Sequence, residues 1–170
     1  VNCSAGQLLN PDFPDKARNA VRNAGLDPKW IEFEVTESAA IDDMTRTVEA
    51  LNKLKAEGSQ IAMDDFGTGY ASLNYLRLLP VDILKIDKSF VMDLLEDKNS
   101  HMIVKAVIDL AHALGLTVHA EGIETAAQRE SLLQMGCDRL QGYWFSKPMD
   151  LQALQGWLKP APAQPLNANR

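Results

Sequence analysis

At residues 61–69 the chain reads Ile61-Ala62-Met63-Asp64-Asp65-Phe66-Gly67-Thr68-Gly69, a short apolar run that ends in two adjacent carboxylates and a glycine-containing loop. A strand turns successive side chains to opposite faces, but at the end of a strand the second carboxylate can swing round toward the first. Two neighbouring carboxylates raise each other's pKa, and a divalent cation removes that conflict. Two aspartates before a glycine also open ordinary turns, so the pair by itself leaves both interpretations open.

Apolar runs typical of strands alternate with amphipathic segments typical of helices along the whole chain. The predicted strands are residues 1–4, 30–35, 60–64, 82–86, 117–120 and 139–143. One predicted helix runs from about Pro14 to Ala24 and another from Ser72 to Leu78. Three more are predicted to end at Gly58, Gly115 and Gly136, and a last helix carries Leu151, Leu154 and Trp157. This alternation predicts a succession of βα units.

Two of the predicted helices carry capping signals. Asn99 or Ser100 is the expected N-cap of one helix, and Thr125 with Gln128 has the spacing of a capping box at the start of the next. The buried stripe expected for the first of these helices is Ile103, Val107, Ala111 and Leu114.

Six βα units in a row predict a parallel sheet, either open and doubly wound or closed into a barrel. A polar residue stands near the C-terminal end of each predicted strand: Asn2, Glu34, Asp64, Lys85, Glu121 and Gln141. A (β/α) barrel gathers its active site in this way, whereas a doubly wound sheet usually has a glycine-rich loop after its first strand, and that loop is absent here. We therefore expect an α/β fold, a partial TIM-type barrel with about six of the eight βα units.

Composition limits the possible partners and surroundings. The 170 residues are 46% apolar and carry a formal charge of −6, which gives no electrostatic footprint for duplex nucleic acid. There is no membrane-spanning apolar stretch, and Cys3 and Cys137 lie far apart, which favours a reduced, cytoplasmic setting. Because the chain starts inside a predicted strand without a methionine, we expect it to be a piece of a longer protein. Residues 1–158 are predicted to form one domain and residues 159–170 a proline-rich disordered tail.

Six motifs, in order along the chain, resemble those of the EAL domain, the cyclic di-GMP phosphodiesterase family. They are Val1-Asn2-Cys3-Ser4, Glu34-Val35-Thr36-Glu37-Ser38, Asp64-Asp65-Phe66-Gly67-Thr68-Gly69-Tyr70, Leu84-Lys85-Ile86-Asp87-Lys88-Ser89-Phe90, Ala120-Glu121-Gly122-Ile123-Glu124-Thr125 and Gln141-Gly142-Tyr143-Trp144-Phe145-Ser146-Lys147-Pro148. They follow the family's order and spacing over nearly all of residues 1–148. The resemblance implies a closed barrel that hydrolyses one phosphodiester of cyclic di-GMP to linear pGpG, with two Mg²⁺ or Mn²⁺ ions in the intact domain.

The resemblance also implies a metal-ligand set, because hard cations require oxygen donors. The ligands are expected to be Asn2, Glu34, Asp64 and Asp65.

Three further residues are expected to act on water and phosphate. Lys85 would add positive charge beside the attacking water and the scissile phosphate, Glu121 would be a ligand or general base, and Gln141 would orient water or phosphate through its amide. A lysine that merely snorkels from a strand end is the alternative for Lys85, but Ile83, Lys85 and Asp87 share one strand face.

The matching family glutamate anchors the loop that follows the two aspartates. The resemblance therefore implies that Glu37 holds this loop at Thr68 and Gly69, and Asp87 is expected to support the same surroundings. Residues 36–38 also suit the start of a helix, and the two roles are compatible. In the family this loop and the next helix commonly form a homodimer contact, so Tyr70, Leu73 and Leu76 are expected to form an exposed apolar patch.

One family motif is absent from this sequence. No Glu-Ala-Leu tripeptide at a strand end precedes Asn2, so the chain resembles the C-terminal two-thirds of the domain. Since the missing glutamate binds metal, catalysis by this chain itself stays open, and sensor or cyclase domains are expected only in the parent protein. A receptor that binds cyclic di-GMP without cleaving it, and an enolase-type lyase, remain as alternatives.

His119 departs from the family pattern. It lies two residues before Glu121 and therefore on the same strand face, where the family usually has an aliphatic residue. A neutral, hydrogen-bonded core histidine is expected here in preference to a metal ligand.

Overall fold

The computed structural model describes residues 1–158 apart from residues 42 and 68–72. The described residues contain six strands: β1 (Asn2–Cys3), β2 (Glu32–Thr36), β3 (Gln60–Phe66), β4 (Ile83–Ile86), β5 (Thr117–Ala120) and β6 (Arg139–Leu140). They form one sheet in the order of the sequence, and every neighbouring pair is parallel. The predicted α/β class with a parallel sheet is therefore confirmed.

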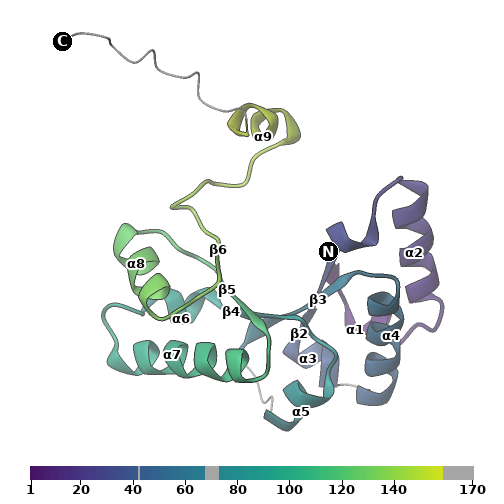
Figure 1. The fold of residues 1–170 in the computed structure, drawn as a ribbon, viewed down its shortest axis with the longest axis horizontal. Coiled ribbons are helices and arrows are strands. Elements are labelled where there is room, and N and C mark those ends of the chain that lie inside the picture. The colour runs from purple at the N-terminus through teal and green to yellow at the C-terminus, as the bar shows by residue number, and fades with distance from the viewer. Residues whose placement is uncertain (42, 68–72, 159–170) are drawn as a thin grey trace.

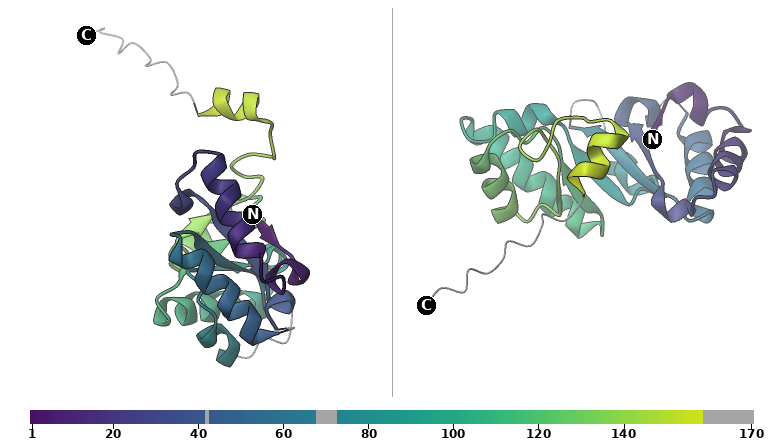
Figure 2. Two further views of the ribbon diagram at one scale, coloured as in Figure 1. Left: turned by 90° about the vertical axis from the view of Figure 1, so that its right-hand side faces the viewer. Right: turned by 90° about the horizontal axis from the view of Figure 1, so that it is seen from above.

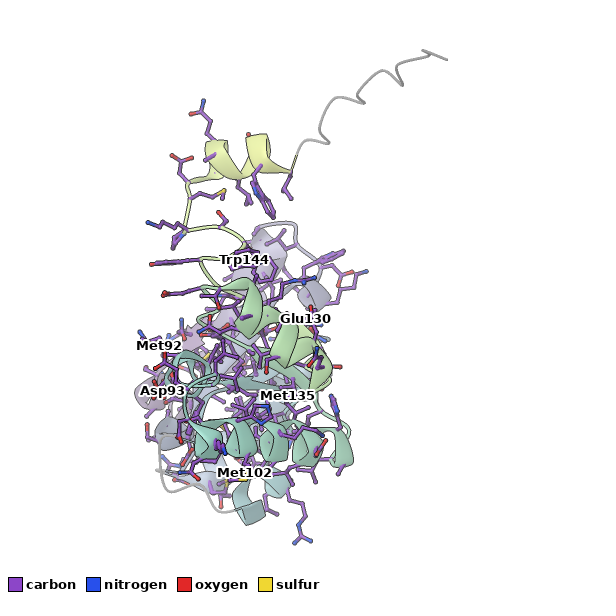
Figure 3. The ribbon with its side chains drawn as sticks, turned by 90° about the vertical axis from the view of Figure 1, so that its left-hand side faces the viewer. Met92, Asp93, Met102, Glu130, Met135 and Trp144 are labelled. Atoms are coloured by element: carbon purple, nitrogen blue, oxygen red, sulfur yellow. The ribbon has the colours of Figure 1, made fainter. Side chains whose placement is uncertain are left out.

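Helices connect the strands and cover the sheet (Figure 1). They are α1 (Ala5–Leu8), α2 (Phe13–Asn23), α3 (Glu37–Ile41), α4 (Met44–Ala56), α5 (Leu73–Leu78), α6 (Lys88–Met92), α7 (Lys98–Ala113), α8 (Ala126–Gln134) and α9 (Leu151–Trp157), with a 3₁₀ turn at Pro28–Trp30. Figure 3 shows the flank made by α7 and α8, with Met102 on the first and Glu130 on the second. No helix among the described residues combines the length and apolar composition that a bilayer crossing needs.

The last helix stands apart from the rest of the molecule. A segment without regular secondary structure leads from β6 to α9, and Figure 1 and the left view of Figure 2 show the helix outside the packed body. Asp150 caps α9 by accepting a hydrogen bond from the amide of Ala153, but none of its residues is buried. The core is thus made by the elements before residue 141.

The sheet has one apolar face and one polar face. On β2, Phe33 and Val35 are buried in the hydrophobic core, whereas Glu32 and Glu34 between them are only partly buried. The residues of the other strands that face this core are Ile61, Met63, Leu84, Ile86, Val118 and Ala120. Because side chains alternate along a strand, the charged residues share the face that is turned away from this core.

The N-cap expected for α7 was wrong, and the expected buried stripe is confirmed at Ala111 and in part at Val107, which packs against the core. The N-cap is Asp97, whose carboxylate accepts hydrogen bonds from the amides of Asn99 at 3.0 Å and Ser100 at 3.1 Å. The buried residues of the helix are Ser100, Val104, Ile108 and Ala111, while the predicted Ile103 and Leu114 are 43% and 40% exposed. Apolar residues occupy neighbouring positions of this helix, Ile103 with Val104 and Val107 with Ile108, so two overlapping apolar stripes were possible. The packing buries the stripe that contains Val104 and Ile108.

The expected apolar patch after the two aspartates is contradicted at its one described side chain. Leu76 is only 3% exposed and belongs to the hydrophobic core, because α5 turns it inward. Tyr70 and the tail at residues 159–170 lie outside the described residues, as does the side chain of Leu73. The capping box of α8 is confirmed: Thr125 Oγ1 accepts from the Gln128 amide, and Gln128 Oε1 accepts from the Thr125 amide.

Gly142 allows the chain after β6 to pack closely against the backbone of Ile123. The carbonyl of Gln141 accepts a hydrogen bond from the Ile123 amide at 3.1 Å, and the Trp144 amide donates to the Ile123 carbonyl at 2.9 Å. A Cβ built on Gly142 would lie 2.2 Å from both the nitrogen and the oxygen of Ile123. Only glycine allows this approach of two backbones.

Gly142→Ala should therefore destabilise the fold, by about 1–3 kcal/mol or more, because the Ile123 backbone would have to move. The measurement is the thermal unfolding midpoint. Gly156→Ala is the matched control, since a Cβ there meets nothing within 4 Å and the residue lies in a helix. Equal midpoints for the two variants would show that the close approach at Gly142 does not constrain the fold.

Candidate functional site

A β-bulge brings the two adjacent aspartates to the same edge of the sheet. Two register pairs flank them, Met63 with Leu84 and Phe66 with Ile86. Asp64 and Asp65 together therefore oppose the single residue Lys85, and one extra residue is accommodated on β3. Asp65 has φ of 54°, in the left-handed region that aspartate tolerates better than most residues. Because of the bulge, neither aspartate is turned into the core.

The ammonium group of Lys85 is the centre of the site. Its Nζ lies 2.7 Å from Glu121 Oε1, 2.9 Å from Glu34 Oε1 and 3.3 Å from Asp64 Oδ1. Lys85 is only 4% exposed, so these ion pairs are shielded from solvent on the lysine side. The four side chains come from the C-terminal ends of β2, β3, β4 and β5, where a parallel barrel places its functional groups.

Charge in the cluster shifts two pKa values. Burial acts to lower the pKa of Lys85, but hydrogen bonds to Glu121 and Glu34 outweigh it and hold the pKa above its ordinary value. Burial raises the pKa of Asp65, and the negative charges of Asp64, Asp87 and Glu121 raise it further. Lys85 opposes this shift without cancelling it. The site therefore holds more negative charge than Lys85 alone neutralises.

Two predicted site residues lie at the borders of this cluster. Asn2 on β1 is in register with Glu34 on β2, so both occupy the same level of the sheet. Gln141 follows β6, and its backbone amide donates a hydrogen bond to the Ala120 carbonyl at 2.9 Å, which places Gln141 next to Glu121. The side chains of Asn2 and Gln141 make no hydrogen bond within the described part of the chain, and the strand register places both residues beside members of the Lys85 cluster.

Glu37 lies beneath the loop that follows the aspartates. It is 4% exposed, and its Oε2 accepts a hydrogen bond from the Gly67 amide at 3.4 Å. This contact is the described part of the predicted loop anchor, and Thr68 and Gly69 lie outside the described residues. Glu37 is also the first residue of α3, so the expected place at a helix start is confirmed.

Asp87 caps α6 and also affects the site through its charge. Its Oδ1 accepts hydrogen bonds from the amide and the hydroxyl of Ser89. Burial acts to raise the pKa of Asp87, but these hydrogen bonds outweigh it and lower the pKa. Asp87 is therefore fixed as a carboxylate whose charge raises the pKa of Asp65. No contact of Asp87 with the anchored loop is seen among the described residues.

A second ion pair, between Arg139 and Glu32, lies on the same face of the sheet. Arg139 Nη1 on β6 lies 3.6 Å from Glu32 Oε2 on β2, although three strands separate them. In a flat sheet these strands would be about 19 Å apart, given the usual spacing of neighbouring strands. The ion pair therefore requires a strongly curved sheet. The sequence analysis did not predict this pair. The only signal was that Glu32 and Arg139 lie two residues before Glu34 and Gln141, and therefore on the same strand faces.

His119 lies between the two cations, Lys85 and Arg139. On β5 it is in register with Lys85 on one side and Arg139 on the other. Burial lowers its pKa, and the nearby charge of Lys85 lowers it further, so the imidazole is neutral as expected. The expected hydrogen bonding is not found within the part of the chain that the structure describes, where the buried Nδ1 has no partner.

Histidine, cysteine, aspartate and glutamate side chains among the described residues form no ready group of three or more that could hold a metal ion. The reason is geometric, since the Lys85 ammonium lies where the oxygens of Glu34, Asp64 and Glu121 converge. Cys3 and Cys137 are free and buried, and burial raises the pKa of each thiol to about 11.

Comparison with known proteins identifies the family. The model of the EAL domain matches residues 1–148. The chain belongs to the EAL domain family. The expected resemblance is thus confirmed over nearly all of the described residues.

Named relatives and solved EAL domains agree with this assignment. The cyclic di-GMP phosphodiesterase NbdA of Pseudomonas aeruginosa is 43% identical over 159 residues, which cover 94% of this chain and 20% of that protein. The PaMucR phosphodiesterase in complex with c-di-GMP has a TM-score of 0.86 at 43% identity, over 91% of this chain and 62% of that one. The EAL domain of Mycobacterium smegmatis DcpA has a TM-score of 0.88 at 42% identity, over 93% and 71%.

These matches confirm the TIM-barrel-like fold class, since the structural neighbours are EAL domains of that type. The chain spans about a fifth of the length of the curated relatives it matches.

Glu37→Ala should loosen the loop after Asp65. The substitution leaves the Gly67 amide without its carboxylate partner, at a cost of about 1–3 kcal/mol if the amide stays shielded from water. We expect faster amide hydrogen exchange at Gly67 and a lower unfolding midpoint. Glu49→Ala, which removes an exposed glutamate from α4, is the control. Unchanged exchange at Gly67 in Glu37→Ala would contradict the anchoring role.

Proposed function

We propose that this EAL domain chain is a metal-dependent phosphodiesterase that hydrolyses cyclic di-GMP to linear pGpG in the cytoplasm. The observation that supports it is the convergence of Glu34, Asp64 and Glu121 on the buried ammonium of Lys85 at the C-terminal ends of four strands. The named relative NbdA is a cyclic di-GMP phosphodiesterase, and the PaMucR phosphodiesterase was solved with c-di-GMP.

The donor set at this edge suits Mg²⁺ or Mn²⁺. Oxygen ligands would come from Asn2, Glu34, Asp64 and Asp65, which is the donor chemistry that hard cations prefer. Burial raises the pKa of Asp65, and the neighbouring carboxylates raise it further. Additional positive charge would be stabilised here. Bound at these residues, the ions would supply the positive charge that a phosphodiester and an attacking water require.

The chain's own residues would then orient and move protons. The Lys85 ammonium, held by three carboxylates, would place its positive charge beside the phosphoryl oxygens as negative charge develops on them. Glu121 would accept a proton from the attacking water. The new P–O bond forms as the bond to the 3′ oxygen of one guanylate breaks, and that oxygen takes up a proton. Gln141 would orient water or phosphate through its amide from the end of β6.

Hydrolysis tests this proposal directly. The purified chain is incubated with cyclic di-GMP and Mn²⁺, and pGpG is separated by chromatography. We expect product from the native chain and at least about 10²-fold less from Lys85→Met, because the variant loses the positive charge that would stabilise the developing negative charge. Lys53→Met is the matched control, since that lysine is exposed on α4 and should keep full activity.

Asp64→Asn should abolish turnover and leave the unfolding midpoint close to native. If the native chain releases no more pGpG than Asp64→Asn, the proposed hydrolysis by this chain is wrong. Binding of the intact nucleotide without cleavage would favour a receptor function instead.

Metal binding has an independent readout in thermal unfolding. Excess Mn²⁺ should raise the midpoint of the native chain, because a ligand that binds only the folded state stabilises it. Asp64→Asn should lose most of this rise, whereas Asp109→Asn, on the exposed surface of α7, should keep it. Since the Lys85 ammonium competes for the same oxygens, Lys85→Met should bind Mn²⁺ at least as tightly as the native chain. An equal rise in Asp64→Asn would exclude this residue as a ligand.

A further inference from the structure

The charged face of the sheet contains more acidic groups than the proposed chemistry uses. Glu32 and Glu34 lie two residues apart on β2 and project from the same face. The Lys85 ammonium contacts Glu34, Asp64 and Glu121 and makes no ion pair with Glu32. Glu32 is instead paired with Arg139, at 3.6 Å.

We propose that Arg139 is a positioning residue: by engaging Glu32 across the curved sheet, it prevents Glu32 from drawing the Lys85 ammonium away from Asp64 and Glu121. The inference rests on the proposed phosphodiesterase activity and adds to it a residue that touches none of the reacting groups.

Strand register supports this division of the charges. Lys85, His119 and Arg139 occupy matching positions on β4, β5 and β6. The neutral imidazole of His119 therefore separates the two cations, and each cation is directed to a different carboxylate of β2. Lys85 engages Glu34 and Arg139 engages Glu32.

The exposure of the two pairs shows why this role differs from a simple structural tie. The Arg139 side chain is 47% exposed and that of Glu32 is 26% exposed, so their ion pair contributes little to stability. Lys85, by contrast, is buried at 4% exposure. An unpaired Glu32 would be a partly shielded negative charge two residues from Glu34 on the same strand face, and the Glu34 carboxylate is one of those that Lys85 contacts.

Four variants test the proposal in the purified chain: Arg139→Gln, Arg139→Lys, Glu32→Gln and the double variant Glu32→Gln/Arg139→Gln. Arg139→Gln should lower kcat for cyclic di-GMP by about tenfold to a hundredfold, with KM little changed, as for other residues that orient catalytic groups from behind. Arg139→Lys keeps a positive charge at this position and should retain most of the native rate. Glu32→Gln alone should be near native, and the double variant should recover the rate lost in Arg139→Gln.

The double variant separates the two explanations. If the ion pair only ties β2 to β6, then Glu32→Gln and the double variant lose as much activity as Arg139→Gln, and the proposal is wrong. Unfolding midpoints are measured alongside, and we expect Arg139→Gln to shift the midpoint by no more than about 5 °C.

A second readout does not depend on hydrolysis. In the chain labelled with ¹⁵N-lysine, the side-chain ammonium resonance of Lys85 is identified by its loss in Lys85→Met. It should be unchanged in Glu32→Gln, shifted in Arg139→Gln and returned toward the native position in the double variant. No shift in Arg139→Gln would overturn the proposal. If the native chain fails to hydrolyse cyclic di-GMP but the resonance behaves as stated, the activity is refuted and the positioning role of Arg139 stands.

Discussion

The ion pairs of the Lys85 ammonium are the interaction on which the site depends. Lys85 Nζ lies 2.7–3.3 Å from carboxylates that arrive on three other strands. A buried cation is tolerated only when it is paired, and clustered carboxylates repel one another unless a cation lies among them. The buried lysine and the clustered carboxylates therefore stabilise one another. The parallel order of the strands meets this condition, because it brings their C-terminal ends to one edge.

Two local departures from regular structure shape the edge where these charges meet. The bulge at Asp64 and Asp65, with φ of 54° at Asp65, turns two consecutive side chains away from the core. The backbone approach at Gly142 then sets the chain after β6 against Ile123. Irregular backbone costs conformational freedom or strain, and proteins tend to keep it where function requires it. Both departures flank the proposed catalytic groups and not the core.

The polar face of the sheet carries two groups of ion pairs. One group contains Lys85 and the carboxylates that the EAL domain family motifs carry. The other is the Glu32–Arg139 pair, and His119 lies in register between the two cations. In our interpretation the first group binds and reacts, and the second keeps the acidic groups of β2 assigned to different partners. Curvature of the sheet makes the second pair possible, since it brings β6 within reach of β2.

The sequence by itself determined the strands, the parallel order and the level at which Glu34, Asp64, Lys85 and Glu121 would meet, because alternation along a strand and the position of its end are local properties. It also determined the Thr125–Gln128 capping box, which needs only four consecutive residues. Only the tertiary structure decided which stripe of α7 is buried, that Leu76 is turned inward, and that Arg139 reaches Glu32. Neighbouring stripes of α7 are equally apolar, and contacts between distant strands depend on how far the whole sheet curves, which no local pattern encodes.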